Sequence, residues 1–241
     1  MMKKRFFDNG FLVLLALLVC TDIVFIGLHL VHTYTPLLPN HVYSIEQDKG
    51  HAEFFQYTKQ FWIILLLTLT FIKEASLTNF SWLMVFCYVL LDDALSIHEN
   101  LGLLTSNLWT FAARMGLRPQ DWGELLVTGT VGVVLLTPVA IAFLRASTRE
   151  RRHTLVLAAL LVLLAFFGVF VDMVHIWFGG DQWGLVEDGG EMVVVSIVLY
   201  YVFRHQFEYA PAASRQDASA ENMHMVADMQ PLTGVQSGQP A

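Results

Sequence analysis

The stretch that decides the fold is residues 10–32, GFLVLLALLVCTDIVFIGLHLVH, which is apolar throughout apart from Thr21, Asp22 and two histidines. About 20 consecutive apolar residues in a helix are enough to cross the hydrocarbon core of a bilayer. Lys3, Lys4 and Arg5 precede this stretch, as basic residues do in a signal peptide. The apolar run is too long for a signal peptide, and Val19 is not the small residue that cleavage before Cys20 would require. We therefore expect a retained first transmembrane helix.

The composition of the whole chain agrees with this expectation. Of the 241 residues, 55% are hydrophobic and only 15% are charged, whereas a soluble domain carries about a quarter charged residues. We predict an all-α integral membrane protein, a bundle of about six transmembrane helices, at about residues 10–32, 54–72, 80–101, 122–144, 154–178 and 185–203. The 14 Lys and Arg residues form no basic face that would indicate nucleic-acid binding. Cys20 and Cys87 lie inside apolar runs and are interpreted as small hydrophobic residues.

The predicted transmembrane domain covers residues 1–205, and residues 206–241 form a tail. The tail mixes Ala, Ser, Gln, Pro and Gly without an apolar period, so we expect it to be disordered. The external connections 33–53 and 102–121 are expected to be loops or interfacial segments.

Basic residues predict the orientation, because short cytoplasmic loops are enriched in Lys and Arg. A cytoplasmic amino terminus places ten of these residues inside and leaves four outside: Lys49, Lys59, Arg114 and Arg118. Both termini are therefore predicted to be cytoplasmic, in a plasma membrane such as a bacterial inner membrane. The oligomeric state is left open.

The most unusual stretch is LDDALSIHE, residues 91–99, inside the third predicted span. An acid at the centre of a bilayer costs about 2.5 to 3.5 kcal/mol on insertion scales, so such residues are interpreted as functional. On a continuous helix with about 100° per residue, Asp92 and Glu99 lie within about 20° of each other. Three further polar residues lie on this face or at its edges: Asp93, Ser96 and His98. Alternatively, the span ends near Leu90 and the remainder is an external loop.

The fifth and sixth spans carry a similar set of residues. Asp172 and His175 are three residues apart, the spacing by which helical bundles bring a carboxylate and an imidazole to one metal ion. The same spacing also suits an ordinary hydrogen-bonded pair. Glu187 and Asp188 open the sixth span, where a helix dipole would also favour them, and Glu191 lies deeper.

The first two spans contribute fewer candidates. Asp22 lies near the middle of the first span and Glu53 lies at the outer entrance of the second. His29, His32 and His51 are interpreted as interfacial histidines. With the predicted orientation, all of the acidic candidates and the histidines in the spans fall in the outer half of the bilayer.

So many carboxylates at one depth would repel one another unless cations or protons compensate them. Lys59 is the only basic residue within a predicted span. Mixed carboxylate and imidazole ligation suits iron, manganese or zinc. We therefore expect a metal site with six ligands: Asp92, His98, Glu99, Asp172, His175 and Glu191. Six further residues would act as additional ligands, would orient the ligands or would carry protons: Asp22, Glu53, Asp93, Ser96, Glu187 and Asp188.

Three functions are compatible with such a site. The first is a membrane metalloenzyme, an oxidoreductase or a hydrolase, that acts on a lipidic substrate reached from the outer leaflet. The second is a transporter or channel for protons or metal cations. The lack of polar residues in the inner half of the predicted spans counts against this function. The third is a non-catalytic membrane protein that holds a structural ion such as calcium.

Overall fold

The computed structural model describes residues 2–109 and 116–208. The chain divides into two units, residues 1–204 and 205–241. The helices, in chain order, are α1 (Met2–Tyr34), the short 3-10 helix η1 (His41–Tyr43), α2 (His51–Lys73), α3 (Leu77–Leu95), α4 (Ile97–Leu108), α5 (Pro119–Arg145), α6 (Thr148–Ala165), the π-helical turn η2 (Phe166–Val171), α7 (Asp172–Phe178) and α8 (Asp181–Glu208). The predicted all-α class is confirmed for the described residues.

Each of the six predicted segments is helical, but not all six helices are apolar enough to cross a bilayer. Four helical runs are long and apolar enough, and a fifth is added if α3 and α4 form one broken span. The four runs are Gly10–Tyr34, His51–Lys73, Pro119–Arg145 and Thr148–Phe178. Helix α8 is not among them, and its first half carries Glu187, Asp188 and Glu191. Helix α8 also continues to Glu208, so residues 206–208 are helical; the rest of the predicted tail lies outside the described residues.

The third predicted span is broken, and this corrects one part of the sequence interpretation. Ser96 adopts the left-handed conformation, with φ 48° and ψ 48°. Helices α3 and α4 meet there at an angle of 73°. The expectation that Asp92 and Glu99 share one face of a continuous helix was therefore wrong, because they lie on different helices. The alternative that the helix ends near Leu90 was also wrong, since α3 continues to Leu95.

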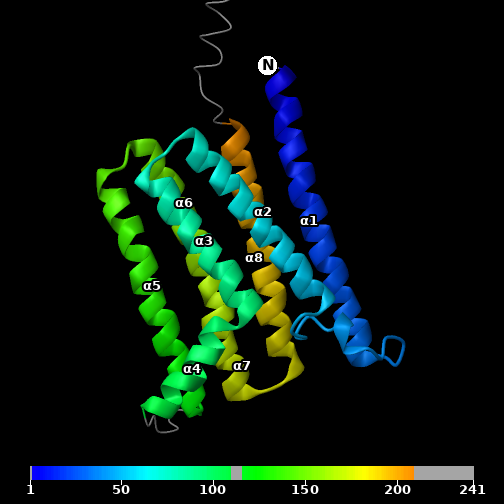
Figure 1. Cartoon of the computed structure of the whole chain (residues 1–241). Helices are drawn as coiled ribbons and strands as arrows, with labels where there is room; N and C mark the ends of the chain where they lie inside the picture. Colours follow the sequence, from blue (N-terminus) through cyan, green and yellow to red (C-terminus); the bar gives the residue numbers. More distant parts are fainter. Residues whose placement is uncertain (1, 110–115, 209–241) are drawn as a thin grey trace, which may run out of the picture. The chain divides into compact units, whose positions relative to one another are not determined.

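The helices in residues 1–204 have two ends at which different elements meet (Figure 1). At one end α1 begins, α2 leads into α3 and α5 leads into α6. At this end Arg149 Nη1 lies 3.8 Å from Glu74 Oε1, so that an ion pair connects the start of α6 with the loop between α2 and α3. At the other end lie η1, the start of α2, helix α4 and the loop between α7 and α8. The predicted acidic residues lie toward this second end.

The core is apolar and centred on α3. The Trp82 side chain is completely buried and donates through its indole nitrogen to Thr154 Oγ1 at 3.3 Å. Around it pack buried side chains of α2, α6 and α8, among them Ile63, Leu67, Leu157, Val198 and Leu199. Helices α4 and α5 approach each other closely because two glycines face each other: a side chain at Gly102 would meet the Glu124 backbone, and one at Gly123 would meet the Gly102 backbone.

A buried ion pair joins three helices next to this core. Lys59 of α2 donates through Nζ to Asp22 Oδ1 of α1 at 2.8 Å, and both side chains are fully buried. Lys59 also donates to the Met192 carbonyl oxygen and to Ser196 Oγ of α8, and Ser196 donates to Asp22 Oδ2 at 2.6 Å. Every charged atom of the pair is thus hydrogen-bonded, which is the condition under which a buried pair is tolerated.

Candidate functional site

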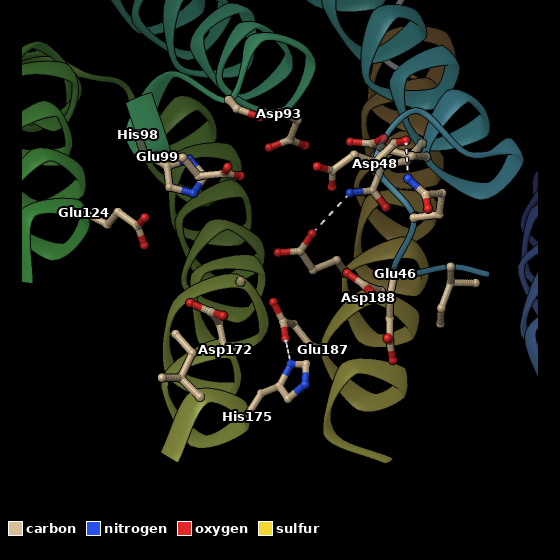
Figure 2. A pocket seen from close by; sticks show the side chains of 18 of the residues that line it. Glu46, Asp48, Asp93, His98, Glu99, Glu124, Asp172, His175, Glu187 and Asp188 are labelled. Atoms are coloured by element: carbon tan, nitrogen blue, oxygen red, sulfur yellow. Dashed lines mark hydrogen bonds and ion pairs between the residues drawn. The ribbon is translucent and has the colours of Figure 1, made fainter. Parts of the chain in front are cut away.

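A cavity of about 520 Å³ lies at the acidic end of the helices, between the η1 loop, α2, the α3–α4 break, α5, α7 and α8. Figure 2 shows its side chains: His98, Glu99 and Glu124 on one side, Asp172, His175 and Glu187 below, and Glu46 and Asp188 on the other side. The lining contains two histidines, one arginine and eleven carboxylates: Glu46, Asp48, Glu53, Asp92, Asp93, Glu99, Glu124, Asp172, Glu187, Asp188 and Glu191.

The structure brings all six predicted ligands to this cavity, and their role as ligands stays a prediction. Five of the six additional candidates also line it: Glu53, Asp93, Ser96, Glu187 and Asp188. Asp22 does not, because its carboxylate is held by Lys59 and Ser196 outside the cavity. The interpretation of Asp22 as a further ligand or proton carrier therefore has no support from its position.

The break at Ser96 creates the first histidine–carboxylate pair. It turns α4 back so that the His98 ring nitrogen Nδ1 lies 2.9 Å from Asp92 Oδ2. Asp92 Oδ1 accepts from the His98 backbone N–H at 2.9 Å and from the Tyr88 hydroxyl at 3.0 Å. Since an ionised carboxylate only accepts hydrogen bonds, Nδ1 carries the hydrogen, and the neutral ring then has its lone pair at Nε2.

The second pair joins α7 to α8. His175 Nδ1 lies 3.0 Å from Glu187 Oε2. The sequence spacing had paired His175 with Asp172, which lines the same cavity, but its hydrogen-bond partner comes from the next helix. In both pairs the carboxylate binds Nδ1, so both imidazoles have the same tautomer and leave Nε2 as the second ring nitrogen.

The Glu191 carboxylate lies against the π-helical turn. A side chain at Gly168, within that turn, would collide with Glu191 Oε1. Gln56 Nε2 donates to Glu191 Oε2 at 3.2 Å. One residue earlier, a side chain at Gly190 would collide with the Phe167 ring. Two glycines thus allow η2 and α8 to approach closely, and π-helical turns of this kind occur often at functional sites.

The wall formed by α2 and α3 is a network of acids and their donors. Glu53 accepts from the Tyr57 hydroxyl and from the Lys49 backbone N–H. The Tyr57 hydroxyl also lies 3.0 Å from the Asp93 carbonyl oxygen. Gln60 donates through Nε2 to Asp93 Oδ2. These donors hold Glu53 and Asp93 in fixed positions.

The sequence analysis missed several residues of the cavity. Glu46 and Asp48 lie in the predicted external connection 33–53, and Glu124 is the third residue of the predicted span 122–144. Glu124 reaches the cavity because Gly102 and Gly123 bring α4 and α5 together. No periodicity in the sequence signals such a contact.

Arg118 supplies the one cationic side chain among the lining residues apart from the histidines. It precedes α5 and donates from Nε and Nη2 to Asp121 Oδ1 at 3.0 and 2.8 Å. This hydrogen-bonded carboxylate raises the pKa of the Arg118 guanidinium above its ordinary value. Much of the Arg118 charge is therefore balanced locally by Asp121, which does not line the cavity.

The ligand types in the cavity are spread over its walls. Among the described residues, no three His, Cys, Asp or Glu side chains converge closely enough to hold one metal ion as they stand. No hydrogen bond to the side chains of Glu99, Asp172 or Asp188 occurs within residues 2–109 and 116–208. The same holds for Glu46 and Asp48, so five of the eleven lining carboxylates have no hydrogen-bonding partner at their side chains within the described part of the chain.

The sequence pattern of a protein family described as a domain of unknown function, DUF8692, matches residues 11–205. This match covers most of the chain, which therefore belongs to that family. No curated protein matches the chain, and no solved structure does either.

Proposed function

We propose that this protein is a multi-pass membrane protein that binds divalent transition-metal ions in its acidic cavity. The observation that carries the proposal is the pairing of each cavity histidine with a carboxylate through Nδ1, His98 with Asp92 and His175 with Glu187. Histidines that bind metals almost always donate their other ring N–H to such a partner, which fixes the tautomer and raises the basicity of the ligating nitrogen.

The pairs change the expected ligand set. Asp92 and Glu187 would orient the two histidines rather than bind the metal. The ligands would be Nε2 of His98 and His175 together with three of the carboxylates that have no hydrogen-bonding partner at their side chains, Glu99, Asp172 and Asp188. Glu191, against the π-helical turn, would complete the set. Mixed nitrogen and oxygen ligation of this kind suits zinc, manganese or iron.

The net charge of the cavity supports a cation as the ligand. Eleven carboxylates line it against one guanidinium, which is itself engaged by Asp121. Like charges that share a site are destabilising until counter-charge arrives. Among the described residues that line the cavity none is Phe, Tyr or Trp, whereas sites for quaternary ammonium ligands use the faces of these rings. An inorganic cation is therefore a better fit than an organic one.

Transport across the membrane is less well supported than binding. Between the Lys59 network and the opposite end of the helices lies the buried apolar cluster that includes Ile63, Leu67, Trp82, Val198 and Leu199. An ion or a proton path would need polar groups through this region. We therefore assign the cavity to binding, and to metal-assisted hydrolysis or oxidation of a lipidic substrate if it is catalytic.

The finer topology belongs to the same proposal. We infer six spans, of which the third is α3, which ends at the break at Ser96, and the sixth is α8. The excess of Lys and Arg at one end then places both termini in the cytoplasm and opens the cavity on the non-cytoplasmic side.

Metal titration of the purified full-length protein in detergent tests the proposal. The protein, stripped with a chelator, is titrated with Zn²⁺, Mn²⁺, Fe²⁺ and Ca²⁺ by calorimetry, and the metal content of untreated protein is measured by elemental analysis. We expect a transition metal to bind, and we expect the double variant His98→Ala/His175→Ala to bind it at least tenfold more weakly. His51→Ala is the matched control, because His51 is exposed at the same end but does not line the cavity.

Two outcomes would contradict the proposal. One is a folded protein that binds none of the four metals. The other is preferential binding of Ca²⁺ with an affinity that the double variant leaves unchanged, which would assign the carboxylates to a structural calcium site.

A further inference from the structure

Helix α4 exposes an apolar stripe at the surface of the described structure. Leu101, Leu104 and Leu108 recur at spacings of three and four and their side chains are exposed, as are Leu103 on another side of the helix and Trp109 at its end. Gly102 is the only buried residue of α4 in the described structure, and it faces α5. A short helix in water does not normally expose such a stripe, since contiguous exposed apolar patches indicate interaction sites.

The direction of α4 excludes that it simply continues the span of α3. The bend of 73° at Ser96 turns α4 away from the α3 axis and across the end of the helices (Figure 1). If the α3 axis runs close to the membrane normal, α4 lies close to the membrane plane. An amphipathic helix in this orientation buries its apolar face in the boundary between headgroups and acyl chains.

Aromatic side chains at the same end agree with this depth. Trp109 follows α4, and Trp177 and Phe178 end α7; each exposes about two thirds of its surface, at 62%, 60% and 69%. The Trp177 ring lies against Gly116, in the segment that follows α4, since a side chain at Gly116 would lie 3.1 Å from the ring. Tryptophan is enriched at both membrane–water interfaces, where its ring matches the mixed polarity of the headgroup layer.

The polar side of the same helix lines the cavity. His98 and Glu99 of α4 are cavity residues, whereas Leu101, Leu104 and Leu108, on the other side of the helix, do not line the cavity. Exposed Leu91 and Leu95 of α3 lead up to the bend, so the apolar surface of α4 is continuous with that of a helix that we assign to the bilayer.

We propose that α4, with Trp109 and Trp177, is a lipid-contact element that lies in the headgroup layer of the bilayer. The acidic cavity then opens at the level of the lipid headgroups rather than deep in the hydrocarbon or far out in water. This inference concerns the position of α4 and does not depend on a metal binding in the cavity.

Site-directed spin labelling in phospholipid vesicles tests the position of α4. In a background in which Cys20 and Cys87 are replaced by alanine, single cysteines are introduced by Leu104→Cys in α4, Val133→Cys in α5 and His41→Cys in η1. Val133 is exposed within a helical run long enough to cross the membrane, and His41 is exposed in a connection. The accessibility of each label to oxygen, which partitions into lipid, is compared with its accessibility to a water-soluble nickel complex.

We expect the label at position 104 to be several-fold more accessible to oxygen relative to nickel than the label at 41, and less so than the label at 133. A label at 104 that matches the one at 41 would place α4 in water and overturn the proposal. A label at 104 that is inaccessible to both reagents would instead indicate contact with another copy of the chain, and would overturn it equally.

A second measurement needs no change within the α4 stripe. Vesicles of lipids brominated near the glycerol backbone or near the chain end are used to quench tryptophan fluorescence, and the contribution of Trp109 is obtained as the difference between the native protein and a Trp109→Phe variant. We expect the shallow bromines to quench Trp109 more strongly than the deep ones. Equal and weak quenching by both would contradict a position in the headgroup layer.

Discussion

The Asp92 carboxylate accepts three hydrogen bonds, from the Tyr88 hydroxyl and from the backbone and ring nitrogens of His98. Its lone pairs are thus largely occupied by donors within the protein. A carboxylate in this position acts on a metal ion through the imidazole that it orients. Its charge is what raises the basicity of Nε2, and an amide of the same shape would not supply it.

Replacing Asp92 by asparagine separates charge from shape. We expect Asp92→Asn to weaken zinc binding by about 10- to 100-fold, the usual effect of removing a partner of a metal-binding histidine. Calorimetric titration measures the change. Glu53→Gln is the control, because it removes one charge from the same cavity but does not contact either histidine. Equal losses in the two variants would show that only the total charge matters.

Lys59 and Asp22 depend on each other, because removal of either partner leaves the other one charged and buried. We expect Lys59→Met alone to lower the free energy of unfolding by about 3–5 kcal/mol, because it leaves the Asp22 charge buried without its partner. The double variant Lys59→Met/Asp22→Leu should recover much of this loss. Denaturant unfolding in detergent micelles measures both. Lys73→Met, at an exposed position, should change little, and a double variant as unstable as the single one would contradict a closed, charge-neutral network.

At the scale of elements, the helices could be predicted but the break between two of them could not. Long apolar runs fix the positions of helices, because backbone groups in lipid must be satisfied within the segment. The bend depends on one residue, Ser96, in a conformation that non-glycine residues rarely adopt. Nothing in LDDALSIHE indicates it, since no Gly or Pro is present. Most of the predicted site residues do line the cavity. Their hydrogen-bond partners, such as Glu187 for His175, could not be predicted, because they depend on how the helices pack against one another.

The left-handed conformation at Ser96 has a measurable energetic signature. A side chain in this region costs roughly 1–2 kcal/mol, which glycine avoids. We expect Ser96→Gly to stabilise the protein by about 1 kcal/mol in denaturant unfolding. Ser106→Gly, inside α4, should have the opposite sign and destabilise by about the same amount. If both variants destabilise, the bend at Ser96 is not the resting conformation of the chain.

The π-helical turn gives a second prediction for elements. We expect Gly168→Ala to destabilise the protein by about 1–3 kcal/mol, because the added methyl group must displace the Glu191 carboxylate. Gly132→Ala adds the same methyl group inside α5 where nothing lies within 4 Å, and it should stabilise the protein by about 0.5–1 kcal/mol because alanine is favoured over glycine in a helix interior. Thermal unfolding in micelles compares the two. Identical behaviour of both variants would contradict the close approach of η2 and α8.

At the scale of the whole molecule, one acidic cavity collects side chains from α2, α3, α4, α5, α7 and α8 and from the η1 loop. A cation bound there would bridge most of the helices of the first unit at one end. Repulsion among the carboxylates opposes the packing of these helices, and the cation would remove that repulsion. Cation binding and the stability of the bundle would therefore be coupled.

This coupling predicts that metal raises the unfolding temperature. A ligand at 100 times its dissociation constant stabilises the native state by about 2.7 kcal/mol. We expect zinc at that concentration to raise the unfolding midpoint and a chelator to reverse the change, as followed by scanning fluorimetry. The His98→Ala/His175→Ala variant should show a much smaller shift. A midpoint that zinc does not change, in protein shown to be folded, would argue against a metal bridging the helices.

The ion pair between α1 and α2 also bears on how the chain enters the membrane during synthesis. Asp22 leaves the ribosome 37 residues before Lys59, and an unpaired acid in the bilayer core costs about 2.5 to 3.5 kcal/mol on insertion scales. Helix α1 alone would therefore be unstable in the bilayer core until α2 supplies Lys59 as the partner of Asp22. The pair would therefore favour entry of α1 and α2 into the bilayer together as a hairpin, and Ser196 can complete the network only after α8 has been synthesised.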